Sequence, residues 1–163
     1  SPLFLAGCLI DKEDPFMDVQ TRTFHVIETL DGSWAGGPIV VSSDPLEEGI
    51  RIKAIDAYDA HDVARGAGAI QMVLAFQLSP GKTREDFAKF KELDFPWVSS
   101  NRGSNRATIW TRRSVDWPFD AFEDVTFASR ADFDRAYKGT PELAEAGEGL
   151  FGATVLVAIV EER

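Results

Sequence analysis

The sequence contains very little cysteine and histidine, and this scarcity limits the chemistry it can support. Cys8 is the one cysteine in the 163 residues, which excludes an intrachain disulfide framework and a cysteine-rich zinc site. The only histidines are His25 and His61, and neither belongs to an HxH, HxxxH or HExxH pattern. A haem would need one of these two as its axial ligand. We therefore expect neither a metal nor another cofactor.

Positive charge is also scarce. Lys and Arg number 17 against 27 Asp and Glu, which gives a formal net charge of −10. Binding to nucleic acid, or to an anionic membrane surface, needs clustered basic residues, so we expect neither as a partner. The apolar stretch Leu3–Ile10 is too short for a signal peptide or a membrane span. The expected compartment is the cytoplasm.

What the chain does have is enough apolar material for a packed core. Hydrophobic residues make up 44% of the sequence and aromatic residues 11%, and there is no low-complexity tract. The length fits one domain or two small fused halves. We place the boundary near the linker-like Ala64–Gly68, with an N-terminal α/β half at residues 1–66 and a second half at residues 67–163.

The second half predicts a strand-helix-strand-strand-helix-strand unit, which is the split βαβ or ferredoxin-like motif. The fold class is therefore α+β. Helices would cover one face of its sheet, and a second sheet would cover the other and leave room for a ligand between them. The expected elements, in chain order, are Ile70–Leu78, Thr83–Leu93, Arg106–Arg113, Phe119–Ala128, Ala131–Ala146 and Leu150–Val160.

The first half leaves two alternatives open. Leu3–Ile10, Pro38–Ser42 and Ile50–Ile55 read as strands, whereas Val19–Leu30 combines a helix-like apolar spacing with many β-branched residues. If Val19–Leu30 is a helix, this half is a degenerate ferredoxin-like repeat, and the chain is a tandem pseudo-dimer. Otherwise a two-stranded ribbon flanks a single ferredoxin-like unit.

The segment Phe122–Gly152, with its D-F-x-x-A helix and the following strand Val155–Val160, resembles the closing part of EthD-type dimeric α+β barrel proteins. Met72–Gly81 and Thr83–Phe90 are similar to the first strand and helix of that family. Related barrels include antibiotic-biosynthesis monooxygenases, muconolactone isomerases and polyketide cyclases or decarboxylases. The resemblance implies a barrel with a hydrophobic cavity, often completed by a homodimer.

It also implies a function. We expect a cofactor-independent lyase, cyclase or isomerase of secondary or aromatic metabolism, which moves a proton on a small aromatic or polyketide-like substrate. Two alternatives stay open: a cofactor-independent monooxygenase of the same barrel type, and a non-catalytic protein that binds a small apolar molecule.

The catalytic candidates are the residues that can move a proton. His61 has flanking carboxylates that favour its protonated form, and His25 lies in an apolar context. Tyr58 or Asp124 would assist them, because the strand that contains Glu123 and Asp124 has no wholly polar face and one of these carboxylates should face a cavity. The plain alternatives are a surface histidine at position 61 and a hydrogen-bonded core histidine at position 25.

The substrate-binding candidates are Trp97, Trp110, Arg112 and Phe122. Tryptophans offer flat apolar walls with one N–H donor each, and an arginine on a cavity-facing strand stabilises developing enolate charge. Ordinary core packing for the tryptophans, and salt bridges for the arginines around Arg112, are the competing interpretations. Trp34 and Trp117 occur in turn-like contexts, where exposed packing is expected.

Overall fold

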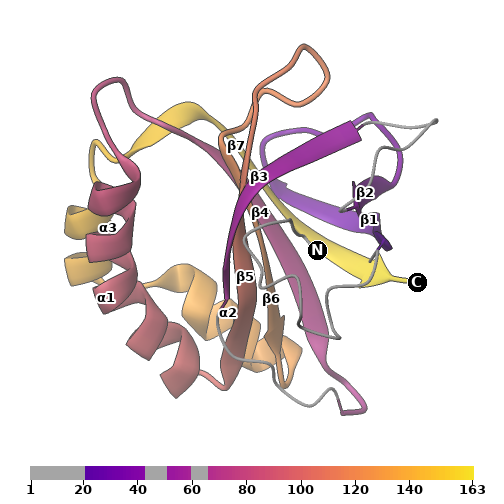
Figure 1. The fold of residues 1–163 in the computed structure, drawn as a ribbon. Coiled ribbons are helices and arrows are strands. Elements are labelled where there is room, and N and C mark those ends of the chain that lie inside the picture. Colours follow the sequence, from indigo (N-terminus) through magenta and orange to yellow (C-terminus); the bar gives the residue numbers. More distant parts are fainter. Residues whose placement is uncertain (1–20, 43–50, 60–65) are drawn as a thin grey trace, which may run out of the picture.

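The strands of the chain close into one barrel, and its helices pack on one side of it (Figure 1). In the computed structural model, residues 21–42, 51–59 and 66–163 are described. In this part of the chain the strand order is β1-β2-β3-β5-β6-β4-β7, with β7 paired to β1. The strands are β1 (Thr21–Asp31), β2 (Ile39–Ser42), β3 (Arg51–Asp59), β4 (Ile70–Leu78), β5 (Gly103–Thr111), β6 (Ala121–Phe127) and β7 (Phe151–Glu162), and the helices are α1 (Arg84–Ser100), α2 (Arg130–Lys138) and α3 (Pro141–Gly147). The α+β barrel class expected from the sequence is thus confirmed.

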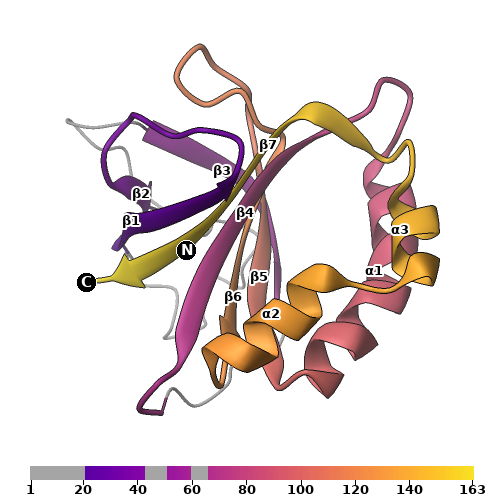
Figure 2. The ribbon, with the colours of Figure 1, turned by 180° about the vertical axis from the view of Figure 1, so that it is seen from behind.

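The second half has the predicted order of strands and helices. Within it, β4 lies between β6 and β7, and β5 pairs with the far side of β6, all antiparallel. Seen from behind, the three helices again lie together on one side of these strands (Figure 2). This arrangement gives the sheet one face that meets the helices and one that meets the barrel interior.

Two helix predictions need correction. The first helix does not end at Leu93, because it continues through Pro96 to Ser100. The predicted helix Ala131–Ala146 is two helices, α2 and α3, separated at Gly139. Gly139 adopts φ 69°, a conformation that glycine takes without strain, and the Thr140 side chain then accepts a hydrogen bond from the N–H of Leu143 to cap α3. Local turn chemistry therefore overrides the continuous helical pattern.

The ambiguous segment Val19–Leu30 is a strand over its described part, so the helix alternative is wrong. β1 is paired on both sides, with β2 and with β7, where its β-branched residues fit a pleated sheet. β3 runs parallel to β2 and antiparallel to β5. The strands of the first half thus close the barrel, and the proposed repeat loses its helix. The predicted strand Leu3–Ile10 lies outside the described residues, and the domain division at residue 66 stays a prediction.

Strand alternation separates the apolar residues of the barrel interior from those that face the helices. Val73, Phe122 and Leu156 point into the barrel, whereas their chain neighbours Met72 and Val157 point toward the helices. Both faces are therefore buried, which explains why every residue of β6 is buried.

Trp117, expected to be exposed, is fully buried in the barrel core, which corrects that expectation. It comes from the connection between β5 and β6, and its Nε1 donates a hydrogen bond to Thr111 Oγ1 at 2.9 Å. Its ring meets the Phe119 ring edge to face, with the centroids 4.9 Å apart. The turn-like sequence DWPF therefore folds an aromatic plug back into the barrel interior.

The barrel interior also contains a buried network of charge, centred on Arg22 of β1. Its guanidinium donates to both oxygens of Asp124 in β6, at 2.9 and 2.8 Å, and to both oxygens of Glu162 in β7, each at 2.9 Å. Gln71 of β4 donates to the same two carboxylates. Burial alone would lower the pKa of Arg22, but the two carboxylates outweigh it and the pKa is raised. Four strands are thereby joined at one point.

We expect Arg22→Met to lower the free energy of unfolding by about 3–5 kcal/mol, because it leaves Asp124 buried without its counter-charge. Urea denaturation measures this loss. The matched control is Arg130→Met, since Arg130 is about half exposed and pairs with Glu28 and Asp134 at the surface. That change should cost no more than about 1 kcal/mol. Equal losses in the two variants would contradict the importance given to the Arg22 network.

Candidate functional site

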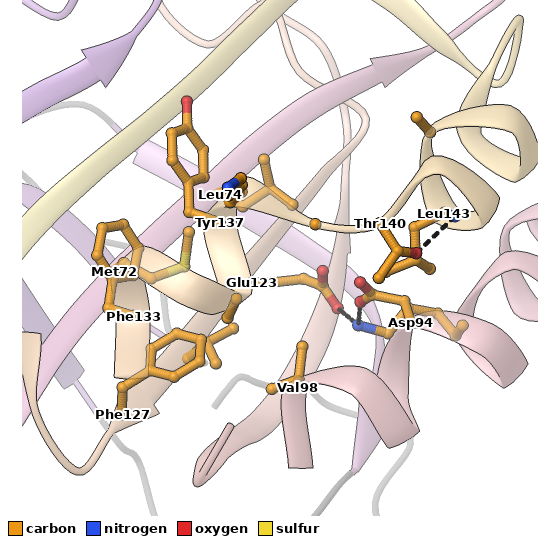
Figure 3. Close-up of a pocket in the computed structure, with 16 residues that line it drawn as sticks. Met72, Leu74, Asp94, Val98, Glu123, Phe127, Phe133, Tyr137, Thr140 and Leu143 are labelled. Carbon is orange, nitrogen blue, oxygen red and sulfur yellow. Dashed lines mark hydrogen bonds and ion pairs between the residues drawn. The ribbon is translucent and has the colours of Figure 1, made fainter. Parts of the chain in front are cut away.

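A pocket lies between the helices and the outer face of the sheet (Figure 3). Its volume is about 350 Å³, and its walls come from β4, β6 and all three helices. Most of the wall is apolar, formed by Met72, Leu74, Val125, Phe127 and Phe133. The Phe127 and Phe133 rings meet edge to face, with the centroids 5.6 Å apart. The pocket can therefore enclose a small molecule with an apolar or aromatic body.

Three charged side chains meet in this apolar setting. Lys91 and Asp94 come from α1, and Glu123 comes from β6. The Lys91 Nζ lies 3.2 Å from Asp94 Oδ2 and 3.2 Å from Glu123 Oε2. The side chain of Glu123 is 2% exposed. One ammonium thus lies between two carboxyl groups on the wall of the pocket.

Helix and strand periodicity explain this meeting. Phe87, Lys91, Asp94 and Val98 share one face of α1 because they are spaced four, three and four residues apart. That face packs on the sheet, as the burial of Phe87 shows. In β6, Glu123 shares its face with Val125 and so points toward the helices, whereas Asp124 points into the barrel.

The carboxylate of Glu123 is held by one oxygen only. Its Oε2 accepts hydrogen bonds from Thr108 Oγ1 at 2.6 Å and Asn105 Nδ2 at 2.8 Å, in addition to the contact with Lys91. Among the described residues, no donor reaches its Oε1. In Figure 3 one Glu123 oxygen carries the dashed line and the other points away from it. A fixed carboxylate therefore offers one acceptor oxygen to the pocket.

Burial and the neighbouring charges set the ionisation of Lys91 and Asp94. Burial raises the pKa of Asp94, and the nearby Glu123 carboxylate adds to the rise, although Lys91 opposes it. Burial alone would lower the pKa of Lys91, but its attraction to Glu123 and Asp94 outweighs this, and the pKa is raised. Lys91 consequently stays cationic, while Asp94 keeps its proton to a higher pH than an ordinary aspartate.

The mouth of the pocket is formed by the end of α2 and by α3. The Tyr137 ring stacks on Phe133 with an interplanar angle of 12°, and Leu143 faces the opening from α3. Helix α3 has no buried residue. Burial, with a contribution from Asp31, raises the pKa of the Tyr137 phenol. This part of the pocket is thus lined by partly exposed side chains.

Of the predicted catalytic residues, the two whose side chains are described, His25 and Asp124, do not line this pocket. Asp124 is inside the barrel, bound to Arg22. His25 lies in β1, partly buried, opposite Glu161 of β7. Tyr58 lies in β3 opposite Thr108, and nothing further is described for it. His61 lies outside the described residues, so its role stays a prediction.

The predicted substrate-binding residues are also dispersed. Phe122 is fully buried in the barrel core and does not line the pocket. The Trp97 indole donates to the carbonyl of Ala136 at 3.1 Å and so joins α1 to α2. Trp110 lines a second hollow of about 690 Å³, where the Arg84 guanidinium lies over its ring. Arg112 is exposed.

Salt bridges account for two of the arginines near Arg112. Arg102 pairs with Asp132 at 2.5 Å, and Arg113 pairs with Asp120 at 2.5 Å. The competing interpretation is thus confirmed for these two residues. Among the described residues that line the pocket, none is an arginine.

The sequence contained a signal for the cluster that the candidate list missed. Lys91 and Asp94 interrupt an apolar helical face that begins at Phe87 and continues at Val98. Charged residues on a buried face must be paired, so this interruption indicates a buried ion pair. Nothing in the spacing identifies Glu123 as the partner, because that requires the position of β6 beside α1.

No family model matches the chain, and no curated protein or solved structure matches it either. None of the helices described here is long and apolar enough to cross a membrane. Among the described residues there is also no group of three or more His, Cys, Asp and Glu side chains that could hold a metal ion. The functional argument therefore rests on the geometry of the pocket.

The raised pKa of Asp94 makes a prediction about stability. A carboxyl group with a raised folded-state pKa favours the fold while it is protonated, and this contribution is lost as the pH rises above about 4 and through the folded-state pKa. We therefore expect the wild type, relative to Asp94→Asn, to lose stability across this window. Urea denaturation at a series of pH values measures the difference, with the exposed Glu92→Gln as control. A difference that is constant or grows with pH would contradict the assignment.

Proposed function

We propose that this protein is a cofactor-independent enzyme that moves a proton on a small, mostly apolar molecule bound between the helices and the sheet. The reaction class is that of a lyase, cyclase or isomerase acting on an aromatic or polyketide-like substrate. The observation that carries the proposal is the Glu123 carboxylate, which is fixed through Oε2 and has Oε1 available beside a buried ammonium.

Glu123 is suited to the role of general base. Three donors hold its Oε2, so the position of Oε1 is set before a substrate enters. The wall residues Leu74 and Val125 place apolar side chains in the same pocket, and apolar surroundings strengthen electrostatic interactions. A C–H or O–H group placed against Oε1 would give up its proton to Glu123.

Lys91 and Asp94 are suited to the rest of the proton transfer. The raised pKa of Lys91 keeps a positive charge next to the oxyanion that forms when the proton leaves. This charge lowers the activation barrier to enolate or phenolate formation. Asp94, whose pKa is raised, can return a proton to a different atom of the substrate. The substrate loses one proton to Glu123 and gains one from Asp94. A proton must then pass from Glu123 to Asp94, through Lys91 between them or through solvent, to restore both groups, and no redox partner is needed.

The finer identity of the fold belongs to the same proposal. We infer that residues 70–162 are a ferredoxin-like unit and that the protein is related to EthD-type barrels, supported by the element order and by the strand order β5-β6-β4-β7. In those proteins a homodimer often completes the barrel. Here β1 to β3 of the same chain cover the sheet, so a homodimer, like a cytoplasmic location, stays a prediction.

A simple probe reaction tests the proposal. In the Kemp elimination of 5-nitrobenzisoxazole, a base removes the C–H proton, the N–O bond breaks, and a coloured cyanophenolate forms. We expect the protein to accelerate this reaction relative to free acetate at the same carboxylate concentration. Glu123→Gln should lower the rate by about 100-fold or more, because general base catalysis contributes about this much.

The control is the same Glu-to-Gln substitution at a residue that does not line the pocket. Glu92→Gln, next to Lys91 but exposed on α1, should leave the rate unchanged. A wild-type rate no higher than that of Glu123→Gln would remove the proposed proton transfer and leave a non-catalytic binding protein.

A further inference from the structure

We propose that the pocket selects neutral ligands that donate an O–H group, such as a phenol or an enol, and rejects carboxylates of the same size and shape. This inference deepens the proposed function, because it names the substrate class of the same pocket. It rests on the charges and acceptor atoms that face the bound molecule.

The charge around the pocket is already compensated before a ligand enters. Two carboxyl groups, Asp94 and Glu123, share the single ammonium of Lys91. The other described basic residue on the lining is Lys138, which is exposed at the mouth. A ligand carboxylate beside this cluster would therefore meet the Glu123 carboxylate, whose counter-charge on Lys91 is already engaged, in a site where burial weakens screening.

The atom that faces the ligand is an acceptor. Glu123 Oε1 receives no hydrogen bond from the described residues. An ionised carboxylate accepts hydrogen bonds and has no proton to donate. A phenol or enol O–H supplies the missing donor. A ligand carboxylate supplies only further acceptors, so it leaves Oε1 without a partner.

The remaining wall favours an aromatic body. Phe127 and Phe133 present ring surfaces, and Met72 adds a polarisable sulfur. A fused two-ring phenol is small enough for a space of about 350 Å³. Its hydroxyl can then reach the charged cluster while its rings stay against the apolar wall.

Isothermal titration calorimetry with 2-naphthol and 2-naphthoate at neutral pH tests the inference. These probes share one ring system and differ in the group that meets Glu123. We expect wild type to bind 2-naphthol at least about tenfold more tightly, as a hydrogen bond to a charged group allows. In Glu123→Gln, which removes the repulsion, naphthoate affinity should rise by about tenfold, whereas Glu92→Gln should behave as wild type.

A second variant locates the binding. Leu143→Trp fills the mouth of the pocket from α3, a helix with no buried residue, so the fold should tolerate it. It should weaken both probes together. Circular dichroism checks that each variant is folded.

Three results would overturn the inference: naphthoate binding as tightly as naphthol in the wild type, naphthoate affinity unchanged by Glu123→Gln, or naphthol binding unaffected by Leu143→Trp. The elimination rate stays a separate readout. If the protein discriminates between the probes but does not catalyse the elimination, the proposed enzyme activity is wrong and the selectivity stands. If it catalyses the elimination but does not discriminate, the selectivity is wrong and the proposed activity stands.

Discussion

The buried network around Arg22 is the interaction on which the closed barrel depends. Arg22 comes from the first described strand, and its carboxylate partners come from β6 and the end of β7, more than a hundred residues later in the chain. A guanidinium with two bidentate partners is satisfied in one arrangement only, because a shift of β1 by one residue would turn Arg22 to the other face. The network therefore specifies register as well as closure.

That register also determines the composition of the pocket. Asp124 and Glu123 are neighbours in β6, so fixing Asp124 inside the barrel sends Glu123 to the helix-facing side. There it meets Lys91, which α1 presents at a spacing set by Phe87 and Val98. Asp124, paired with Arg22, and Glu123, paired with Lys91, thus point to opposite faces of one strand, the first into the barrel and the second toward the pocket.

The sequence predicts the order of strands and helices in the second half because these elements are local: apolar runs of strand length, such as Ile70–Leu78, and stretches with helical spacing, such as Thr83–Leu93. It predicts the site poorly because the site is not local. Lys91 and Glu123 are far apart in the chain, and only the placement of α1 over β6 joins them. The residue type alone also cannot separate a binding site from a packed core, because aromatic side chains suit both. This is why the sequence misplaces Trp97, Trp110 and Phe122. The helix at Val19–Leu30 fails because pairing with two neighbouring strands outweighs its helical spacing.

If the cluster of Lys91, Asp94 and Glu123 served packing alone, it would stabilise the fold no more than apolar side chains would. Burying ions costs several kcal/mol each, and apolar side chains of similar volume often stabilise such a position as well or better. In the Arg22 network, side chains from four strands (β1, β4, β6 and β7) are hydrogen-bonded to one another. In the pocket, by contrast, Glu123 keeps one oxygen without a described donor, and Asn105 beside it has a buried Oδ1 that also lacks one. The buried Asn105 Oδ1 without a partner, beside a Glu123 oxygen that no described donor reaches, contrasts with the paired groups of the Arg22 network, and this contrast supports the proposed binding role of the pocket.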